Sequence, residues 1–355
     1  MKRVLILATT PFMHDGLTKI IMDVYDYSKE RVSFEFASSF YEENEYWSRL
    51  KLEHAPVHVL PRKRKVLEYM RGIYKIVRKG GYNGVYIHGN SAMMFLEAFP
   101  ARLAGVKSII THCHNTKSDF PLVHYIVKPF FNKIVTDKIA CSELAGAWAY
   151  SGDYKVVLNG IDIAKYRFDQ QAREEYRRKL GWEKNFIIGH VGRFNKQKNH
   201  SFLIDIFREI YRKDTTARLL LIGEGELMEA VVQRVKALGL SDAVRFLGIT
   251  DCVDKYMQAM DLFLLPSLFE GLCIVGIEAQ ASGLPLVITD TTSKQIQVTD
   301  QVHWMSLNSP PLSWGQKALS LKGCVRQDTS RALAEAGFDK SATLEIICKI
   351  LCNTA

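Results

Sequence analysis

Short apolar segments alternate with helix-like segments along most of the chain, and this alternation is the feature that most constrains the fold. The strand candidates are VLILAT (4–9), GVYIHG (84–89), SIITHCHN (108–115), KIACS (138–142), NFIIGHVGR (185–193), RLLLIG (218–223), VRFLG (244–248), DLFLLP (261–266) and PLVITD (285–290). A strand–helix–strand rhythm produces a parallel sheet with helices on both faces. We therefore expect an α/β fold made of doubly wound parallel sheets.

The strand candidates form two series, separated by a polar and strongly charged segment from Gln170 to Lys184 that reads as a connecting helix or linker. A chain of 355 residues also favours two domains. We place the first domain at residues 1–168 and the second at residues 169–333. In such sheets, ligands bind beyond the carboxyl ends of the strands, so the expected site is a cleft between two facing domains.

Cysteine usage and hydropathy indicate a reduced, cytoplasmic protein. The seven cysteines are scattered and contain no C-x-x-C pair, which supports neither a disulfide framework nor a zinc site. The first apolar run, Val4 to Ala8, is too short for a signal peptide. Since no uncharged apolar run approaches about 18 residues, we expect no membrane-spanning helix.

The net charge of +9 is concentrated between Lys51 and Gly80, where nine basic residues stand against two acidic ones. Within residues 61–79 the apolar side chains recur at helical spacing, which predicts a basic amphipathic helix. Such a helix can lie on an anionic membrane surface. The alternative is a surface helix whose basic face is merely solvated. We expect no nucleic-acid partner, because no binding motif accompanies the charge.

Two cations and a pair of glycines follow strands of the second series. Arg193 and Lys198 stand five residues apart in VGRFNKQKNH, where a guanidinium and an ammonium together suit a diphosphate. Their other reading is two surface cations in a loop. Gly223 and Gly225, in LLLIGEGEL, allow close backbone approach to a ligand, or form a plain strand–helix turn.

Two glutamates occupy the apolar, glycine-containing stretch PSLFEGLCIVGIEAQASG. Glu270 precedes a helix predicted from about Cys273 to Ala281, and Glu278 lies within that helix. The free amides of Gly271, Leu272 and Cys273 would form an anion site at the start of the helix. Carboxylates beside such a site can accept hydrogen bonds from sugar hydroxyls. Alternatively, Glu270 caps the helix and Glu278 pairs with a buried cation.

Taken together, these motifs resemble those of the retaining glycosyltransferases of family 4. The resemblance rests on the E-x7-E run from Asp261 to Asp290, and on VGRFNKQKNH, LLLIGEGEL, VRFLG, VVLNGID (156–162) and ITHCHNT (110–116), in the order of that family. It covers nearly the whole chain. It implies the GT-B fold, in which two Rossmann-like domains face each other across a cleft and a C-terminal helix, here about residues 334–355, packs back onto the first domain.

By this resemblance, the second domain binds a nucleotide-sugar donor and the first receives the acceptor. Arg193 and Lys198 hold the diphosphate, Glu278 binds the ribose hydroxyls and Glu270 contacts the transferred sugar. One histidine, His112 or His114, lies near the reacting sugar; the two alignments remain open, with His114 preferred. The remaining donor-binding positions implied by the family are Gly16, Gly223, Gly248, Gly271, Leu272, Cys273 and Ile274.

Two positions depart from the family pattern. The first loop reads HDGLTK rather than the common double glycine, which weakens the assignment of Gly16. Cys273 stands where many relatives have proline. We expect no metal and no cofactor, because cationic side chains and a helix N-terminus can stabilise the leaving diphosphate.

The implied reaction is transfer of a hexose or N-acetylhexosamine, with retention, from a UDP-sugar to a lipid-linked saccharide. The acceptor is expected to be linked to undecaprenyl diphosphate, as in capsule and exopolysaccharide synthesis, which would place the protein on the inner face of the cytoplasmic membrane. The alternatives are a non-catalytic nucleotide-sugar-binding protein, or a family 4 transferase that uses a GDP-sugar or a soluble acceptor.

Overall fold

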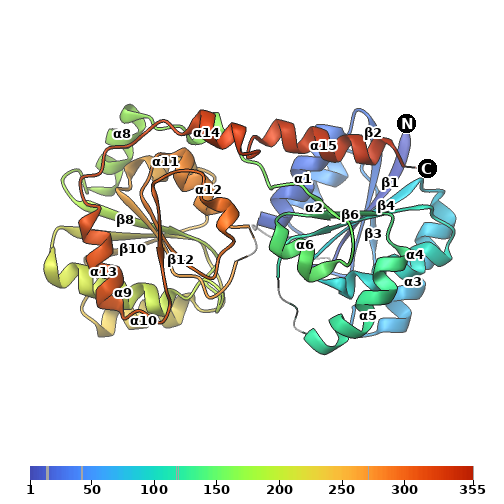
Figure 1. Ribbon diagram of the computed structural model, residues 1–355, viewed down its shortest axis with the longest axis horizontal. Helices are drawn as coiled ribbons and strands as arrows, with labels where there is room; N and C mark the ends of the chain where they lie inside the picture. The colour runs from blue at the N-terminus through green and yellow to red at the C-terminus, as the bar shows by residue number, and fades with distance from the viewer. Residues whose placement is uncertain (13–15, 41–42, 117, 119, 271, 355) are drawn as a thin grey trace. The chain divides into compact units, whose positions relative to one another are not determined.

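The computed structural model describes every residue except 13–15, 41–42, 117, 119, 271 and 355. The chain divides into two compact units (Figure 1). Unit 1 comprises Met1–Asn159 together with Ser341–Ala355, and unit 2 comprises Gly160–Lys340.

The described part of unit 1 contains a parallel sheet with the strand order β3-β2-β1-β4-β5-β6-β7. Because all neighbouring strands run in the same direction, their carboxyl ends share one edge of the sheet. The strands are β1 (Lys2–Ala8), β2 (Val32–Ser38), β3 (Val57–Val59), β4 (Gly84–Gly89), β5 (Ser108–Cys113), β6 (Asp137–Ala140) and β7 (Lys155–Val156).

Helices connect these strands and cover the sheet of unit 1 (Figure 1). They are α1 (Gly16–Ser28), α2 (Glu45–Leu52), α3 (Val66–Gly80), α4 (Phe95–Leu103), α5 (Pro121–Ile134) and α6 (Glu143–Ala149), with a short 3-10 turn, η1 (Ala92–Met94). The C-terminal helix α15 (Lys340–Cys352) joins them. Its Glu345 accepts hydrogen bonds from Tyr27 and Arg31, and its apolar face packs into the core around β1 and β2.

Unit 2 repeats the same topology with the strand order β10-β9-β8-β11-β12-β13, again entirely parallel. Its strands are β8 (Phe186–Val191), β9 (Ala217–Ile222), β10 (Val244–Gly248), β11 (Leu262–Leu265), β12 (Leu286–Thr289) and β13 (Val302–Met305). Its helices are α7 (Ile163–Tyr166), α8 (Gln170–Leu180), α9 (His200–Lys213), α10 (Met228–Ala237), α11 (Val253–Ala259), α12 (Ile274–Ala281), α13 (Pro311–Ser320) and α14 (Ser330–Glu335), with a 3-10 turn, η2 (Lys294–Ile296).

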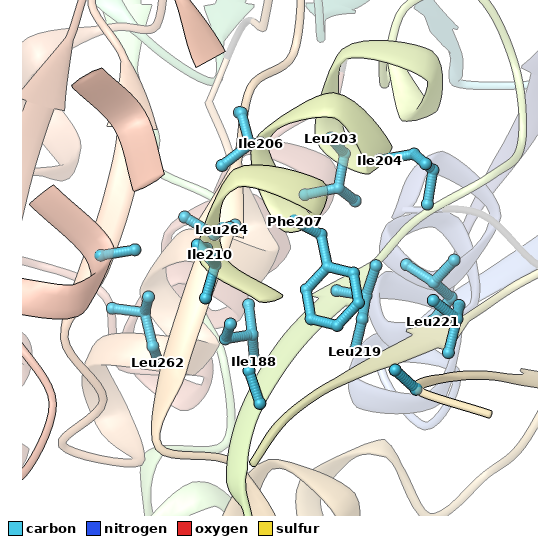
Figure 2. Packing of buried hydrophobic residues seen from close by; sticks show 14 of the residues in the cluster. Ile188, Leu203, Ile204, Ile206, Phe207, Ile210, Leu219, Leu221, Leu262 and Leu264 are labelled. Carbon is cyan, nitrogen blue, oxygen red and sulfur yellow. The ribbon is translucent and has the colours of Figure 1, made fainter. Parts of the chain in front are cut away.

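The core of unit 2 lies between this sheet and the helix α9 (Figure 2). Leu203, Phe207 and Ile210 lie on the inner face of α9 and pack against side chains of β8, β9 and β11, including Ile188 and Leu219. All of these side chains are fully buried. The apolar runs that predict the strands thus form the interior of the unit.

Each of the nine strands predicted from the sequence is present, and the fold class is confirmed. The structure adds four strands that the sequence analysis did not identify: β2, β3, β7 and β13. Glu35 interrupts the apolar run of β2, and it is accommodated by Arg3, His58 and Tyr82. The strands β3 and β7 contain three and two residues, which is too short for a periodic signal.

The sequence limits of the two units differ from the predicted domain limits of 168 and 333. Ile161 pairs with Asp339, and Tyr166 bonds to Glu278, so residues 160–168 belong with unit 2. The helix α14 belongs with unit 2 as well, and the return to unit 1 begins in α15. Contacts with residues distant in the sequence decide these limits, and composition cannot show such contacts.

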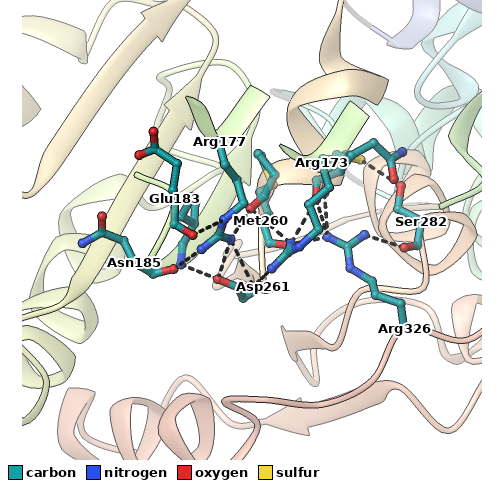
Figure 3. Close-up of polar contacts among 12 residues, drawn as sticks. Arg173, Arg177, Glu183, Asn185, Met260, Asp261, Ser282 and Arg326 are labelled. Carbon is teal, nitrogen blue, oxygen red and sulfur yellow. Dashed lines mark hydrogen bonds and ion pairs between the residues drawn. The ribbon is translucent and has the colours of Figure 1, made fainter. Parts of the chain in front are cut away.

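Three arginines and one aspartate form a polar network at the amino end of β11 (Figure 3). Arg173 and Arg177 of α8 both bind the carboxylate of Asp261, which also accepts a hydrogen bond from the amide of Ile187. Arg326 donates to carbonyl groups that follow α12 and end α11. Burial, followed by the charge of Arg173, lowers the pKa of Arg326 to about 9. The network therefore ties α8, β8, β11 and the C-terminal segment of unit 2 together.

Replacing Asp261 by alanine should destabilise unit 2, because two largely buried guanidinium groups lose their shared carboxylate. We expect the free energy of unfolding to fall by about 2–4 kcal/mol, measured as a lower urea midpoint. The matched control is Asp242→Ala, which removes an exposed carboxylate from the same unit. Equal midpoints for the two variants would contradict a structural role for this network.

Candidate active site

The carboxyl ends of β8 and β11 lie side by side in unit 2, at the point where the strand order reverses. At such a switch point, the loops after the two strands leave in opposite directions, which makes room for a ligand at the sheet edge. Here hydrogen bonds tie the two loops together. The amide of Leu268 donates to the carbonyl of Gln197 over 2.8 Å, and the side chain of Asn199 donates to the carbonyl of Pro266 over 3.1 Å.

An ion pair joins the same two loops. Lys198 Nζ lies 2.7 Å from Glu270 Oε1, and Gln197 Nε2 donates to Glu270 Oε2 over 3.1 Å. The side chain of Lys198 is 16% exposed and that of Glu270 is 9% exposed. Burial by itself would lower the pKa of Lys198, but the negative charges nearby, Glu270 first, raise it above its ordinary value. Lys198 is therefore held as a cation at the sheet edge.

Glu278 lies in α12 and is also buried. Tyr166, the last residue of α7, donates its hydroxyl proton to Glu278 Oε1 over 2.8 Å. Burial, and then the charge of Glu278, raise the pKa of Tyr166 well above its usual range. The tyrosine thus remains a hydrogen-bond donor and fixes the orientation of the carboxylate.

Cys273 occupies the position before the first residue of α12. The pKa of its thiol is affected by the charges of Glu270, Lys198 and Glu278. Within α12, the amides of Gly276 and Ile277 donate to the carbonyl of Cys273, so the amides of Leu272, Cys273 and Ile274 precede the first intrahelical donors. Gly271, predicted to be part of this anion site, lies outside the described residues. Burial, followed by the charge of Glu270, raises the pKa of Cys273 to about 12, which makes a reactive thiolate unfavourable.

Arg193 differs from the buried residues of the site. Its side chain is 44% exposed, and its Nε lies 3.3 Å from Glu226 Oε2 in the loop after β9. The structure therefore brings Lys198, Glu270 and Glu278 together in the interior of the site. Arg193 lies at its exposed side.

The packing and backbone conformation of unit 2 explain why glycine stands at positions 223, 225 and 248. A Cβ atom on Gly223 would lie 2.3 Å from the carbonyl oxygen of Gly192, and one on Gly225 would lie 2.5 Å from that of Phe194. The backbone that approaches these glycines is thus the chain's own loop after β8. Gly248 has a φ of +77°, a left-handed conformation that favours glycine, and its carbonyl accepts the amide of Gly223. These three glycines support the loop that carries Arg193 and Lys198.

Three histidines lie near the carboxyl ends of β4 and β5 in unit 1. His112 is fully buried, and its Nδ1 lies 2.9 Å from the hydroxyl of Tyr86. His114 is only partly buried, and its Nε2 lies 3.0 Å from Nδ1 of His88. Of the two predicted candidates, His114 is therefore the less buried residue, although its Nδ1 is buried.

All three imidazoles are neutral at physiological pH. Burial lowers the pKa of His114 to about 3, and burial together with the neighbouring histidines lowers the pKa of His88 and His112 well below the usual range. A neutral His114 bonded to His88 has one ring nitrogen that donates and one that accepts. The two rings can therefore donate and accept hydrogen bonds while they stay neutral, and the low pKa of His114 makes it a poor proton acceptor.

The same histidines offer ring nitrogens that all lie within 4.8 Å of one another, a spacing that could hold a metal ion. The bond between His88 and His114 uses Nδ1 of the first ring and Nε2 of the second. The remaining nitrogens, His88 Nε2, His112 Nε2 and His114 Nδ1, are buried and have no hydrogen-bond partner among the described residues. The absence of a metal in the reaction stays a prediction. Gly16, the remaining predicted site residue, is the first residue of α1, in the connection that follows β1.

Three residues of these constellations were missed by the sequence analysis: Gln197, Tyr166 and His88. Gln197 lies between predicted site residues but carries no charge. Tyr166 and Glu278 are 112 residues apart in the sequence, and no local pattern predicts their hydrogen bond. His88 could have been found, since it is the last residue but one of a predicted strand and lies two residues after Tyr86 on the same face.

Comparison with known proteins shows the family. The profile described as "Glycosyl transferases group 1" matches residues 172–305, which include the whole Lys198, Glu270 and Glu278 constellation. Over 291 residues the chain is 30% identical to the putative glycosyltransferase EpsF of Bacillus subtilis, a match that covers 77% of this chain and 76% of EpsF. Over 253 residues it is 26% identical to the Escherichia coli UDP-Gal:alpha-D-GlcNAc-diphosphoundecaprenol alpha-1,3-galactosyltransferase, covering 67% of this chain and 65% of that enzyme.

Among solved structures, HepE of Anabaena in complex with UDP-glucose aligns with a TM-score of 0.81, covering 98% of this chain and 99% of HepE at 20% identity. This likeness concerns the fold, which is that of the GT-B glycosyltransferases. On its sequence relationship to EpsF and its match to the family profile, the chain belongs to the group 1 glycosyltransferases.

Proposed function

We propose that this glycosyltransferase moves a hexose or N-acetylhexosamine from a UDP-sugar to a saccharide linked to undecaprenyl diphosphate, in the synthesis of a bacterial surface polysaccharide. The observation that carries the donor part is the buried constellation of Lys198, Glu270 and Glu278 at the β8–β11 switch point. The acceptor part is supported by the named substrate of the Escherichia coli relative. The UDP part is supported by that relative and by the UDP-glucose bound to HepE.

The proposed donor contacts follow from charge and position. Lys198, together with Arg193 and the amides at the start of α12, holds the diphosphate. Glu278, oriented by Tyr166, accepts hydrogen bonds from the ribose hydroxyls. Glu270 faces the transferred sugar. Gly223 and Gly248 support the loop that carries Arg193 and Lys198. Gly16 is proposed as a further donor-binding position.

The chemical step is cleavage of the bond between the sugar carbon and the diphosphate oxygen. Negative charge grows on the diphosphate as that bond breaks, and Lys198 with the α12 amides stabilises it in place. This stabilisation is the reason why we propose a reaction without a metal. We further propose that the acceptor hydroxyl attacks from the side of the leaving diphosphate, which takes up the hydroxyl proton, so that configuration is retained. We propose that the neutral His114 of unit 1 contacts the reacting sugar.

The donor proposal predicts which nucleotide stabilises the protein. UDP and UDP-sugars should raise the melting temperature, by an amount that grows with ligand concentration above the Kd. GDP and ADP at the same concentration should have a smaller effect. Stronger stabilisation by GDP or ADP in this thermal-shift series would refute the UDP assignment, and the absence of any nucleotide effect would refute the donor site.

The two glutamates should differ in what they control. Glu278→Gln should weaken UDP affinity on the order of tenfold, because a carboxylate hydrogen bond to a ribose hydroxyl is stronger than an amide one. Glu270→Gln should lower kcat more than it weakens UDP binding. Calorimetric UDP titration and turnover of UDP-sugar measure the two effects, and the reverse pattern would contradict the roles assigned here.

We also propose that unit 1 docks on an anionic membrane through residues 61–79. The structure separates the cations of this segment into two groups. Lys63 Nζ lies 2.7 Å from the fully buried Glu97, which also accepts a hydrogen bond from Tyr69, so Lys63 has a structural role. The cations exposed along α3 are Arg71, Lys75, Arg78 and Lys79.

Reversing Arg71, Lys75 and Lys79 to glutamate should release the protein from vesicles that contain phosphatidylglycerol at low salt, because each exposed cation adds to the attraction of an anionic surface. The matched control reverses Lys184, Lys213 and Lys236, which are exposed in unit 2 and change the net charge equally. Equal co-sedimentation of the two variants with the vesicles would show that the charge of α3 is only solvated.

A further inference from the structure

The helix α5 exposes apolar side chains to solvent along most of its outer surface. Ordinary surface helices place apolar residues toward the core and polar residues outside. Here the exposed fractions of six large side chains range from 39% to 73%. The residues, which we call the α5 apolar face, are Phe120, Leu122, Val123, Tyr125, Ile126 and Phe130.

The inner side of α5 is already packed without these residues. Phe131 is fully buried, and the fully buried His124 stacks on Trp148 with ring centroids 3.9 Å apart. His124 Nδ1 also accepts the amide proton of Ala92 over 3.1 Å. The α5 apolar face is therefore not needed for the packing of α5 against the interior of unit 1. An exposed apolar patch of this kind marks an interaction surface.

Charge identifies the kind of partner. The helices α3, α4 and α5 pack in sequence, α4 contacting both of the others, on one side of the unit 1 sheet (Figure 1). The cations exposed on α3 therefore belong to the same helix layer as the α5 apolar face. The sequence of α5 itself, PLVHYIVKPFFNKI, contains lysines and no acidic residue, and its Lys133 is exposed. Apolar side chains flanked by cations suit the boundary between anionic headgroups and acyl chains.

We propose that the α5 apolar face inserts into the surface of an anionic bilayer, while α3 contacts the headgroups. Among the described residues, no helix is long and apolar enough to span a membrane. The α5 apolar face would add a hydrophobic contact to the electrostatic one. This inference extends the proposed membrane docking and rests on it for the identity of the surface.

The test replaces Leu122, Ile126 and Phe130, one turn apart on α5, by glutamine. Wild-type protein should stay partly bound to vesicles of phosphatidylglycerol and phosphatidylethanolamine when salt rises from about 0.1 to about 1 M, because screening weakens charge attraction but not apolar burial. The triple variant should lose that salt-resistant binding, with a decrease on the order of tenfold in the partition coefficient. The control variant carries Leu52→Gln, Leu144→Gln and Val325→Gln, three exposed apolar residues outside α5.

Three outcomes would overturn the inference. The first is complete release of the wild type at high salt, and the second is equal binding by the triple and control variants. The third is a dimer of the wild type in solution, measured by light scattering, that the triple variant abolishes, since the α5 apolar face would then contact a second copy. UDP stabilisation, measured on the same preparations, should be unchanged in the triple variant. If the donor proposal fails, UDP will not stabilise the wild type either. That result is therefore distinguishable from a failure of the membrane inference, which concerns vesicle binding alone.

Discussion

The buried ion pair between Lys198 and Glu270 is the interaction on which the proposed donor site depends. The strand order of unit 2 sends the loops after β8 and β11 in opposite directions, and this pair, 2.7 Å long, joins them again. A buried ion pair adds little net stability compared with apolar packing, because both charges lose their hydration. Its presence at a sheet edge, beside a helix N-terminus and a second carboxylate, is explained better by ligand binding than by folding.

Much of this arrangement could be predicted from the sequence, because it depends on local patterns. Apolar runs mark the strands, and residues that follow parallel strands must meet at one edge of the sheet. That logic predicts one site for Lys198 and Glu270, and the family resemblance adds Glu278 from within the helix that follows. The contact of Tyr166 with Glu278 could not be predicted, since it joins segments 112 residues apart and nothing in the local sequence marks Tyr166. The strand β2 was not predicted either, because Glu35 interrupts its apolar run. The residues that contact Glu35, namely Arg3, His58 and Tyr82, come from other parts of the sequence.

The same residue type can serve packing or function, and only the surroundings distinguish the two. Gly223 and Gly225 looked like residues that approach a ligand, but the backbone next to them is the chain's own loop, which carries Arg193 and Lys198. His112 and His114 are two residues apart, yet their surroundings differ. His112 is fully buried beside Tyr86, and His114 is partly exposed beside His88. On α5 the usual pattern is inverted, with a histidine inside and apolar residues outside.

The central claim is that the β8–β11 edge of unit 2 binds the nucleotide sugar. A crystal structure of the wild-type protein with UDP tests it most directly. The account predicts diphosphate oxygens within hydrogen-bond distance of Lys198 Nζ and of the amides at the start of α12, and ribose hydroxyls on the carboxylate of Glu278. UDP bound elsewhere in unit 2, or bound at this edge with no ribose hydroxyl on the carboxylate of Glu278, would contradict the account.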